Sequence, residues 1–150
     1  VTTVANSGTC YELTLVDKVR DADGNLLDDN SAAVRNHVSI DGSYWDAIHA
    51  GMREVVESRS DYADFGVQVA GKTGTAQESR SRPNHALFVC YAPYQSPEIA
   101  VATRVAYGYT SSYAAQITKD VLAYYFKLRD AQELVTGTAQ ELQGGAVNAD

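Results

Sequence analysis

The segment GVQVAGKTGTAQ, which begins at Gly66, contains a lysine that fits two unrelated kinds of chemistry. Gly66, Gly71, Lys72 and Thr73 match the phosphate-binding loop pattern G-x-x-x-x-G-K-[ST]. Lys72, Thr73 and Gly74 also form the K-T-G triplet of some enzymes that act through an acyl-serine. The first pattern requires a curled loop followed by a helix, whereas the second requires an extended strand. The local structure therefore decides between them.

The neighbours of Lys72 argue against the phosphate-binding loop. Such a loop needs a buried strand before its first glycine and a helix that begins at the lysine. The residues before Phe65 are polar and turn-like, and the four residues between the two glycines alternate as a strand does. After Lys72, two threonines, Gly74 and Pro83 interrupt any helical pattern. A nucleotide-binding protein that uses Gly66–Thr73 is therefore only an alternative interpretation.

A strand at the edge of a cleft suits the same residues better. Thr73 and Thr75 are two positions apart, so a strand places both hydroxyl groups on one face. Gly74 lies between them, and a glycine within a strand often marks the close approach of a ligand or another backbone. Lys72 can then project towards a carboxylate. We therefore expect residues 66–78 to be a strand that contributes to a binding site.

Composition limits the class of protein and its partners. A chain of 150 residues, 45% hydrophobic and 21% charged, is typical of one globular domain or a large part of one. The net charge of -7 argues against a nucleic-acid partner, because binding phosphates requires an excess of Lys and Arg. Cys10 and Cys90 form no disulfide framework, and neither they nor the dispersed histidines have metal-ligand spacing. We expect no cofactor.

The first half of the chain predicts two strands and a helix. Residues 11–19 alternate as a half-buried strand, and residues 34–40 can return beside it. The alternation places three apolar side chains of the first strand on one face: Tyr11, Leu13 and Leu15. A helix is expected from Ser43 to about Glu57, with Asp46 three positions after Ser43 as in a capping box. Its apolar stripe consists of Trp45, Ile48, Met52, Val55 and Val56.

The second half predicts an antiparallel sheet that is covered by a helix. Strands are expected at 66–78, 85–92 and 98–107, joined by short connections. A final helix begins at Ser111 or Ser112 and ends at residues 126–128, and residues 129–150 are expected to be a mobile tail. The expected helix stripe is Ala114, Ile117, Val121, Leu122 and Tyr125, and the sheet residues expected to admit it closely are Ala100, Ala102 and Ala106. The fold class is α+β, an antiparallel sheet with flanking helices.

Four segments together point to a known family. They are ANSGTCYELTLVDKVRDADGN, GKTGTAQ, HALFVCYAP and AAQITKDVLAYYF. In their order and spacing, from about Val1 to Phe126, the chain resembles the transpeptidase domain of bacterial class B penicillin-binding proteins. The resemblance implies that residues 1–128 are the C-terminal portion of that domain, an incomplete penicillin-binding/β-lactamase-like fold. Cys90 and Leu87 depart from the glycine and tryptophan that are common at these positions in the family.

The resemblance also implies roles for the K-T-G segment. In the family the triplet lies on the third strand of a five-stranded antiparallel sheet beside the active site. Lys72 would bind the terminal carboxylate of a D-alanyl-D-alanine stem peptide of peptidoglycan, or of a β-lactam, and would support proton transfer. Thr73 would hydrogen-bond that carboxylate, and Gly74 would leave room for the substrate. The backbone N–H of Thr75 would supply half of the oxyanion hole.

Two further family motifs are missing from the printed sequence. The nucleophile of the family lies in S-x-x-K and a second motif is S-x-N, but no serine of the chain starts either pattern. In the family both motifs lie upstream of the segment that starts with ANSGT. We therefore expect the chain alone to be a soluble, catalytically inert fragment. Its parent would cross-link peptidoglycan from a cytoplasmic-membrane anchor, with this domain on the extracytoplasmic side.

An incomplete sheet has a structural consequence. If the strand at 98–107 lacks its family neighbour, its edge is left unpaired and hydrophobic, which favours pairing with another chain. We therefore expect a homodimer or a higher oligomer. A non-catalytic interaction module is the second alternative function for the chain by itself.

Overall fold

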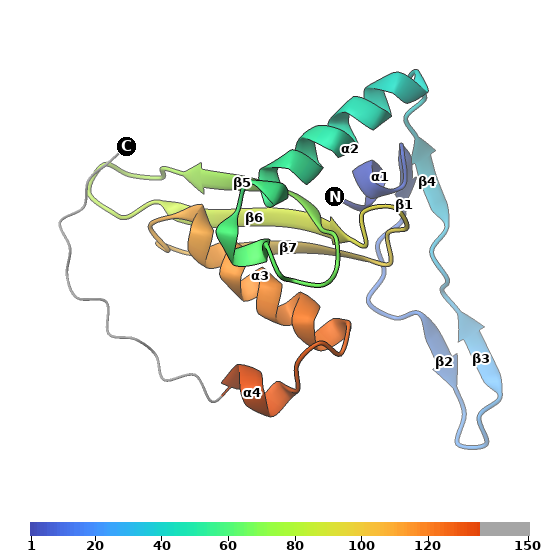
Figure 1. Ribbon diagram of the computed structural model, residues 1–150. Coiled ribbons are helices and arrows are strands. Elements are labelled where there is room, and N and C mark those ends of the chain that lie inside the picture. The colour runs from blue at the N-terminus through green and yellow to red at the C-terminus, as the bar shows by residue number, and fades with distance from the viewer. Residues whose placement is uncertain (136–150) are drawn as a thin grey trace.

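The centre of the computed structural model is a three-stranded antiparallel sheet (Figure 1). The structure describes residues 1–135. The strands are β5 (Ala70–Ala76), β6 (His85–Ala92) and β7 (Ile99–Val105), in the order β5-β6-β7. Six of the eight residues of β6 are buried, because this strand is apolar on both faces and lies in the middle. The α+β class and the antiparallel strand arrangement that the sequence predicts are confirmed.

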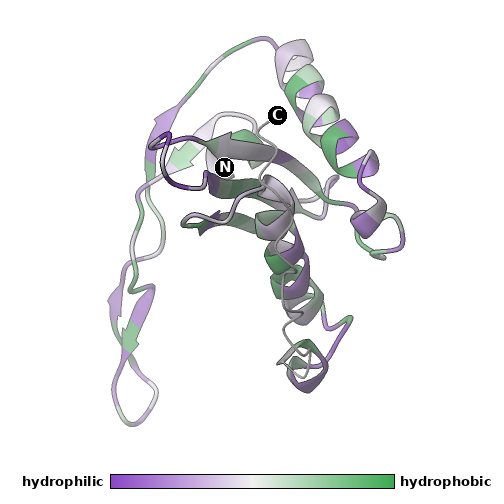
Figure 2. Ribbon diagram, turned by 90° about the vertical axis from the view of Figure 1, so that its left-hand side faces the viewer, coloured by the Kyte–Doolittle hydropathy of each residue, from purple (hydrophilic) through white to green (hydrophobic). Residues whose placement is uncertain are grey.

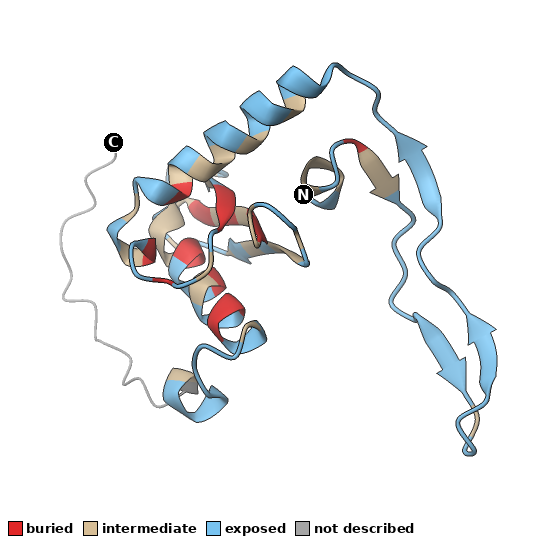
Figure 3. Ribbon diagram, turned by 45° about the vertical axis from the view of Figure 1, so that its right-hand side comes forward, coloured by how far each residue is buried: buried red, intermediate tan, exposed pale blue. Residues whose placement is uncertain are grey.

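Helix α3 (Ser111–Tyr125) covers one face of this sheet. The register aligns Thr73 with Phe88 and Phe88 with Thr103, so these three side chains share the covered face. The Thr103 hydroxyl lies 2.7 Å from the hydroxyl of Thr118 on the helix. The helix residues buried at this contact are Ala114, Ala115, Thr118, Leu122 and Ala123 (Figure 3). Small side chains on the helix therefore allow it to approach the sheet closely.

The buried stripe of α3 differs from the sequence prediction. Ala114 and Leu122 are buried as expected, but Ile117, Val121 and Tyr125 are each 45–46% exposed. The predicted stripe was too wide, because it joined the face that packs on the sheet to a neighbouring apolar face. The alanines of β7 are also placed differently from the prediction. Ala102 is exposed, and it is Val101 and Val105 that pack against the core under α3.

Helix α2 (Gly42–Glu57) lies beside β5. Its N-cap is Asp41, whose carboxylate accepts a 2.9 Å hydrogen bond from the Ser43 N–H, so the predicted role of Asp46 in the cap is wrong. These hydrogen bonds to Ser43 hold the pKa of the Asp41 carboxyl below its usual value. The Arg53 guanidinium donates to the Val69 carbonyl at 2.9 Å and ties the helix to the chain just before β5.

The apolar stripe of α2 is only partly buried. Val56 is the one residue of this helix that is fully buried in the described structure, and Ile48 is 40% exposed. The His49 ring packs edge-on against Tyr91 of β6 at 5.7 Å between ring centroids. One end of α2 therefore packs on the sheet, and the other end extends beyond it (Figure 3).

Two small ribbons form an arm that extends from the sheet (Figure 1). After helix α1 (Thr2–Ala5), strand β1 (Thr9–Tyr11) pairs with β4 (Val34–His37), and β2 (Lys18–Arg20) pairs with β3 (Leu26–Asp29). The predicted return of the chain after a turn is therefore correct. The predicted continuous, half-buried strand over 11–19 is wrong, because β1 ends at Tyr11, β2 begins at Lys18, and residues 12–17 between them belong to neither strand.

The arm carries apolar residues without a second layer to bury them in the described structure. Leu13 and Leu15 are 94% and 105% exposed, although their alternation with polar residues is the pattern of a half-buried strand. Figure 2 shows hydrophobic segments along the arm, and Figure 3 shows β2, β3 and β4 as exposed over their whole length. Alternation predicts one apolar face, but it does not say whether another element covers that face.

The remaining elements are short. A 3₁₀ turn at Ser60–Tyr62 joins α2 to the segment before β5, and the Tyr62 hydroxyl donates to the Ala115 carbonyl at 2.8 Å. Helix α4 (Ala131–Val135) occupies the beginning of the predicted tail, and residues 136–150 lie outside the described structure. No helix among residues 1–135 is both long and apolar enough to cross a bilayer.

The two faces of α3 can be compared by mutation. Leu122→Ala should lower the free energy of unfolding by about 2–5 kcal/mol, because it leaves a cavity at a side chain with no exposed surface. Ile117→Ala, on the face that is 46% exposed, should cost less than about 1 kcal/mol. Urea unfolding followed by circular dichroism measures both. Equal losses for the two variants would contradict the packing described above.

Candidate functional site

The K-T-G triplet lies in the middle of β5, an outer strand of the sheet. All seven residues of β5 pair with β6, from Ala70 opposite Tyr91 to Ala76 opposite His85. In the described residues no strand pairs with the other edge of β5. The strand begins at Ala70 rather than Gly66, where φ is +82° and the chain turns. Because β5 continues through Lys72 as a strand, the phosphate-binding loop interpretation is wrong.

The register separates the K-T-G side chains between the two faces of the sheet. Thr73 and Thr75 lie opposite Phe88 and Ala86 and share one face, as the sequence predicts. Lys72 lies on the other face, opposite Val89. An outer strand makes both faces accessible from its open edge, so groups from either face can reach one ligand there.

The lysine ammonium turns towards that open edge. Lys72 Nζ donates a 2.9 Å hydrogen bond to the carbonyl oxygen of Thr73. Within a strand, the N–H and C=O groups of one residue point to the same side and alternate between neighbouring residues. The backbone groups of Thr73 therefore face the open edge, and so does the N–H of Thr75, two residues later. An ammonium and a backbone N–H donor are thus directed to the same edge.

Two glycines hold β5 close to β6. A Cβ atom at Gly71 would lie 2.7 Å from Cζ of Phe88 and 2.9 Å from the Val89 carbonyl oxygen. A Cβ atom at Gly74 would lie 3.3 Å from Cβ of Leu87, which is a tight contact. The glycines around Lys72 therefore allow the close pairing that fixes the register of the triplet.

The electrostatics of the open edge favour an anionic ligand. Lys72 is exposed, and it takes part in none of the ion pairs of the described residues. Among residues 1–135 its ammonium has only a neutral carbonyl as partner, so a carboxylate can bind there in a charge-assisted hydrogen bond. No group of three or more His, Cys, Asp or Glu residues within 1–135 could hold a metal ion.

The cysteines do not supply a nucleophile at this edge. Cys90 is fully buried under α3, and burial raises the pKa of its thiol to about 12. Cys10 is partly exposed but lies on β1, in the arm. Burial likewise raises the pKa of the Tyr91 hydroxyl, on the opposite face of β6, to about 12. Neither cysteine therefore places a thiol at this edge.

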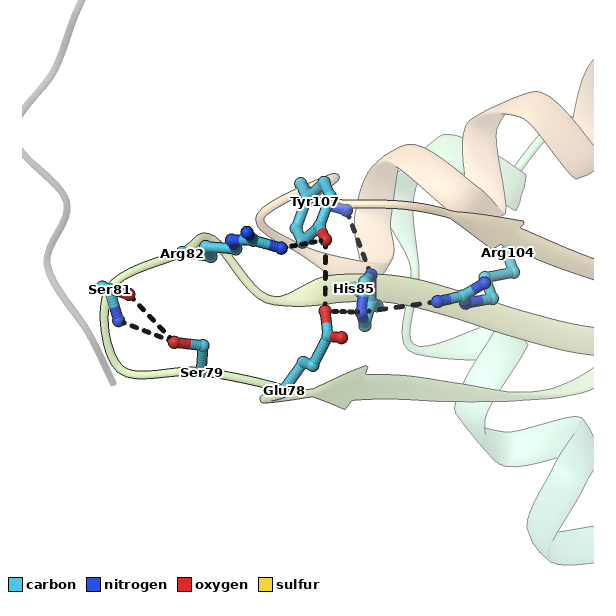
Figure 4. A network of polar contacts seen from close by, with 7 residues as sticks. All are labelled: Glu78, Ser79, Ser81, Arg82, His85, Arg104 and Tyr107. Carbon is cyan, nitrogen blue, oxygen red and sulfur yellow. Dashed lines mark hydrogen bonds and ion pairs between the residues drawn. The ribbon is translucent and has the colours of Figure 1, made fainter.

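Sequence reasoning missed a polar cluster at the end of the sheet beyond the K-T-G triplet. His85, one of the dispersed histidines without metal-ligand spacing, contacts Glu78 and the backbone of Tyr107 (Figure 4). These residues belong to three different strand ends: Glu78 and His85 are seven positions apart, and Tyr107 follows His85 by 22. No local pattern connects them, so only the sheet register could have revealed the cluster.

Comparison with known proteins decides the family. The family model described as the penicillin binding protein transpeptidase domain matches residues 1–123. The chain belongs to the penicillin-binding protein transpeptidase family. The class B resemblance drawn from the K-T-G segment and its neighbours is thereby confirmed.

Relatives of this transpeptidase domain include both sequences and solved structures. Penicillin-binding protein 2A of Bacillus subtilis is 31% identical over 163 aligned positions, covering 94% of the chain and 23% of the relative. Peptidoglycan D,D-transpeptidase MrdA of Haemophilus influenzae is 34% identical over 57% of the chain and 16% of its own length. The imipenem acyl-enzyme complex of penicillin-binding protein A from M. tuberculosis aligns with a TM-score of 0.72 and 27% identity, over 83% of the chain and 28% of that structure.

The domain therefore spans only part of its relatives. The chain corresponds to 23% of the length of penicillin-binding protein 2A and 28% of the solved chain of penicillin-binding protein A. The structural alignments with solved transpeptidases confirm the penicillin-binding fold that the resemblance implies. Of the five sheet strands that the resemblance implies, the described residues contain β5, β6 and β7.

The close approach at Gly71 can be tested in this domain. Gly71→Ala should lower the free energy of unfolding by about 1–3 kcal/mol, because the added methyl group collides with Phe88 and with the β6 backbone. Gly51→Ala is a matched control: Gly51 is an exposed residue of α2 whose added Cβ meets nothing within 4 Å, so this change should stabilise by about 0.5–1 kcal/mol. Thermal unfolding of both variants makes the comparison. A neutral Gly71→Ala would mean that the two strands are not this close.

Proposed function

We propose that this chain provides the K-T-G wall of a peptidoglycan D,D-transpeptidase active site. The observation that carries the proposal is the geometry of β5. Its open edge presents the Lys72 ammonium, next to the Thr73 carbonyl, and the Thr75 N–H. Several relatives are named peptidoglycan D,D-transpeptidases, which supports the same reaction for the parent of this chain.

The substrate class follows from the chemistry of that edge. A stem peptide ending in D-Ala-D-Ala carries a terminal carboxylate, and a β-lactam carries a comparable one. In our proposal, Lys72 and the Thr73 hydroxyl bind this carboxylate, and Gly74 leaves room for the substrate backbone. The Thr75 N–H then donates to the oxyanion of the tetrahedral intermediate, where preorganised donors have their greatest effect. Lys72 also supports proton transfer.

The acyl-serine step requires groups that the printed sequence does not contain. The S-x-x-K and S-x-N patterns are both missing from it, and an activated nucleophile needs its base within hydrogen-bond reach. We therefore propose that the chain alone forms no acyl-enzyme. The parent protein would act on the extracytoplasmic side of the cytoplasmic membrane, to which we propose that it is anchored.

A hybrid enzyme tests this function. Residues 1–128 would replace the matching segment of Bacillus subtilis penicillin-binding protein 2A, which aligns with 94% of the chain. The hybrid should be acylated by fluorescent penicillin, and Lys72→Ala should lower the acylation rate roughly hundredfold, because it removes the cation that faces the substrate carboxylate.

Two controls accompany the hybrid. Lys18→Ala removes a lysine of similar charge from the arm, where its contact with Asp29 is 3.9 Å, and should leave the rate unchanged. The 150-residue chain by itself should show no mass shift with a β-lactam. Full acylation of the Lys72→Ala hybrid would overturn the proposed role, and an adduct on the isolated chain would contradict its inactivity.

The non-catalytic alternative rests on the opposite edge of the sheet. Strand β7 pairs only with β6 in the described residues, so its outer edge is unpaired. Such an edge can pair with another chain, and we propose that the isolated chain forms a homodimer or a higher oligomer through it.

Light scattering at micromolar concentration measures this association. Ala102→Lys places a charge in the middle of β7, at an exposed position, and should shift the chain to the monomer. Ala106→Lys adds the same charge just beyond the strand and should leave the oligomer intact. A monomeric wild-type chain would contradict this proposal.

A further inference from the structure

Three strand ends meet at one carboxylate beyond the K-T-G triplet (Figure 4). Glu78 follows β5, His85 begins β6 and Tyr107 follows β7. One oxygen of Glu78, Oε2, lies 3.1 Å from His85 Nε2 and 3.2 Å from the Tyr107 hydroxyl. The same carboxylate oxygen therefore connects all three strands of the sheet at this end.

The hydrogen bonds of His85 define its tautomer. The imidazole is buried, and its Nδ1 accepts a hydrogen bond from the Tyr107 N–H at 3.1 Å. Nδ1 therefore carries no proton, so the hydrogen of the neutral ring is on Nε2 and is donated to Glu78. Arg104 Nη2 lies 3.4 Å from this Nε2 and cannot donate to a protonated nitrogen. Its contribution is a positive charge beside the imidazole.

Tyr107 is held in an unusual backbone conformation. Its φ of +55° lies in the left-handed region, which residues with a side chain rarely adopt. Its ring packs on His85 at 4.9 Å between centroids, and its hydroxyl accepts a 2.9 Å hydrogen bond from Arg82. A strained residue persists only where its surroundings determine its conformation, and here His85 and Glu78 hold both its N–H and its hydroxyl.

This cluster is close to the proposed substrate edge. His85 pairs with Ala76, which directly follows Thr75, and Glu78 is three residues beyond Thr75. Because β5 has no neighbour on its outer side within the described residues, β6 and this cluster restrain its C-terminal end. A histidine that only fills space in the core has no reason to contact both partners. His85 contacts the carboxylate that follows β5 and the strained tyrosine that follows β7.

We propose that Glu78, His85 and Tyr107 form a clamp that fixes the end of the K-T-G strand. The three are positioning residues: they hold the Thr75 N–H in place, and they touch no substrate themselves. The positioning role rests on the proposed transpeptidase function. The clamp itself is a property of the chain and can be measured without catalysis.

Nuclear magnetic resonance of the labelled chain tests the clamp directly. Glu78→Ala should lower the backbone order parameters of residues 74–78 from about 0.85 to below about 0.6. Glu78→Gln keeps an acceptor oxygen and should restore most of the order. Glu98→Ala removes an exposed glutamate outside the cluster and should change nothing at these residues. The ¹⁵N shifts of His85 should identify the Nε2–H tautomer. Unchanged order in Glu78→Ala, or an Nδ1–H tautomer, would overturn the proposal.

The positioning role has a separate readout in the hybrid enzyme. Glu78→Ala should lower its acylation rate roughly ten- to a hundredfold, because small displacements of a positioned group have effects of this size, and Glu78→Gln should recover most of it. Lost order with an unchanged rate would overturn the positioning role. Full acylation of the Lys72→Ala hybrid would instead reject the proposed function, while the order measurement would still test the clamp.

Discussion

The pairing of β5 with β6 is the interaction on which the candidate site depends. It runs without a register shift over the whole length of β5, and it sets which side chains face α3 and which face the opposite side. A one-residue slip would exchange the faces of Lys72 and Thr73 and would turn the Thr75 N–H inwards. Gly71 supports this close pairing, because a side chain there would collide with the backbone of β6, and Gly74 leaves room for the Leu87 side chain.

The pairing is covered unevenly on its two faces. Helix α3 buries one face of β6 and β7 with small side chains, while the face that carries Lys72 is covered at one end by α2. Val89 and Leu87, opposite Lys72 and Gly74, are only partly buried as a result. The domain therefore has a firm core on one side of its sheet and an accessible surface on the other.

Much of this arrangement could be predicted from sequence, and the failures have a common cause. Periodicity and β-branched residues are local properties of the sequence. They predict strand β6, helices α2 and α3, and the strand at Lys72–Thr75. Burial is not local. Leu13 and Leu15 alternate correctly but are covered by nothing in the described residues, and Ile117 continues a helical stripe but is 46% exposed, outside the buried contact of α3 with the sheet.

The candidate site divides in the same way. The K-T-G residues could be found from their types and spacing, because adjacent residues of one strand are necessarily close together. Glu78, His85 and Tyr107 could not, because their proximity depends on the register of three strands. The capping residue of α2 was assigned to Asp46 instead of Asp41. Both residues suit a helix start, and only the backbone geometry distinguishes them.

The hydrogen bond from Lys72 to the Thr73 carbonyl has a consequence for ligand discrimination. An ammonium has three N–H donors, and the contact with this neutral oxygen at 2.9 Å uses one of them. The resting contact therefore holds the Lys72 side chain in place and leaves two donors for a ligand. A neutral amide oxygen would accept from them as the Thr73 carbonyl does, whereas a carboxylate would add the attraction between opposite charges. At this edge, chain ends would thus be separated by charge before their shape is compared.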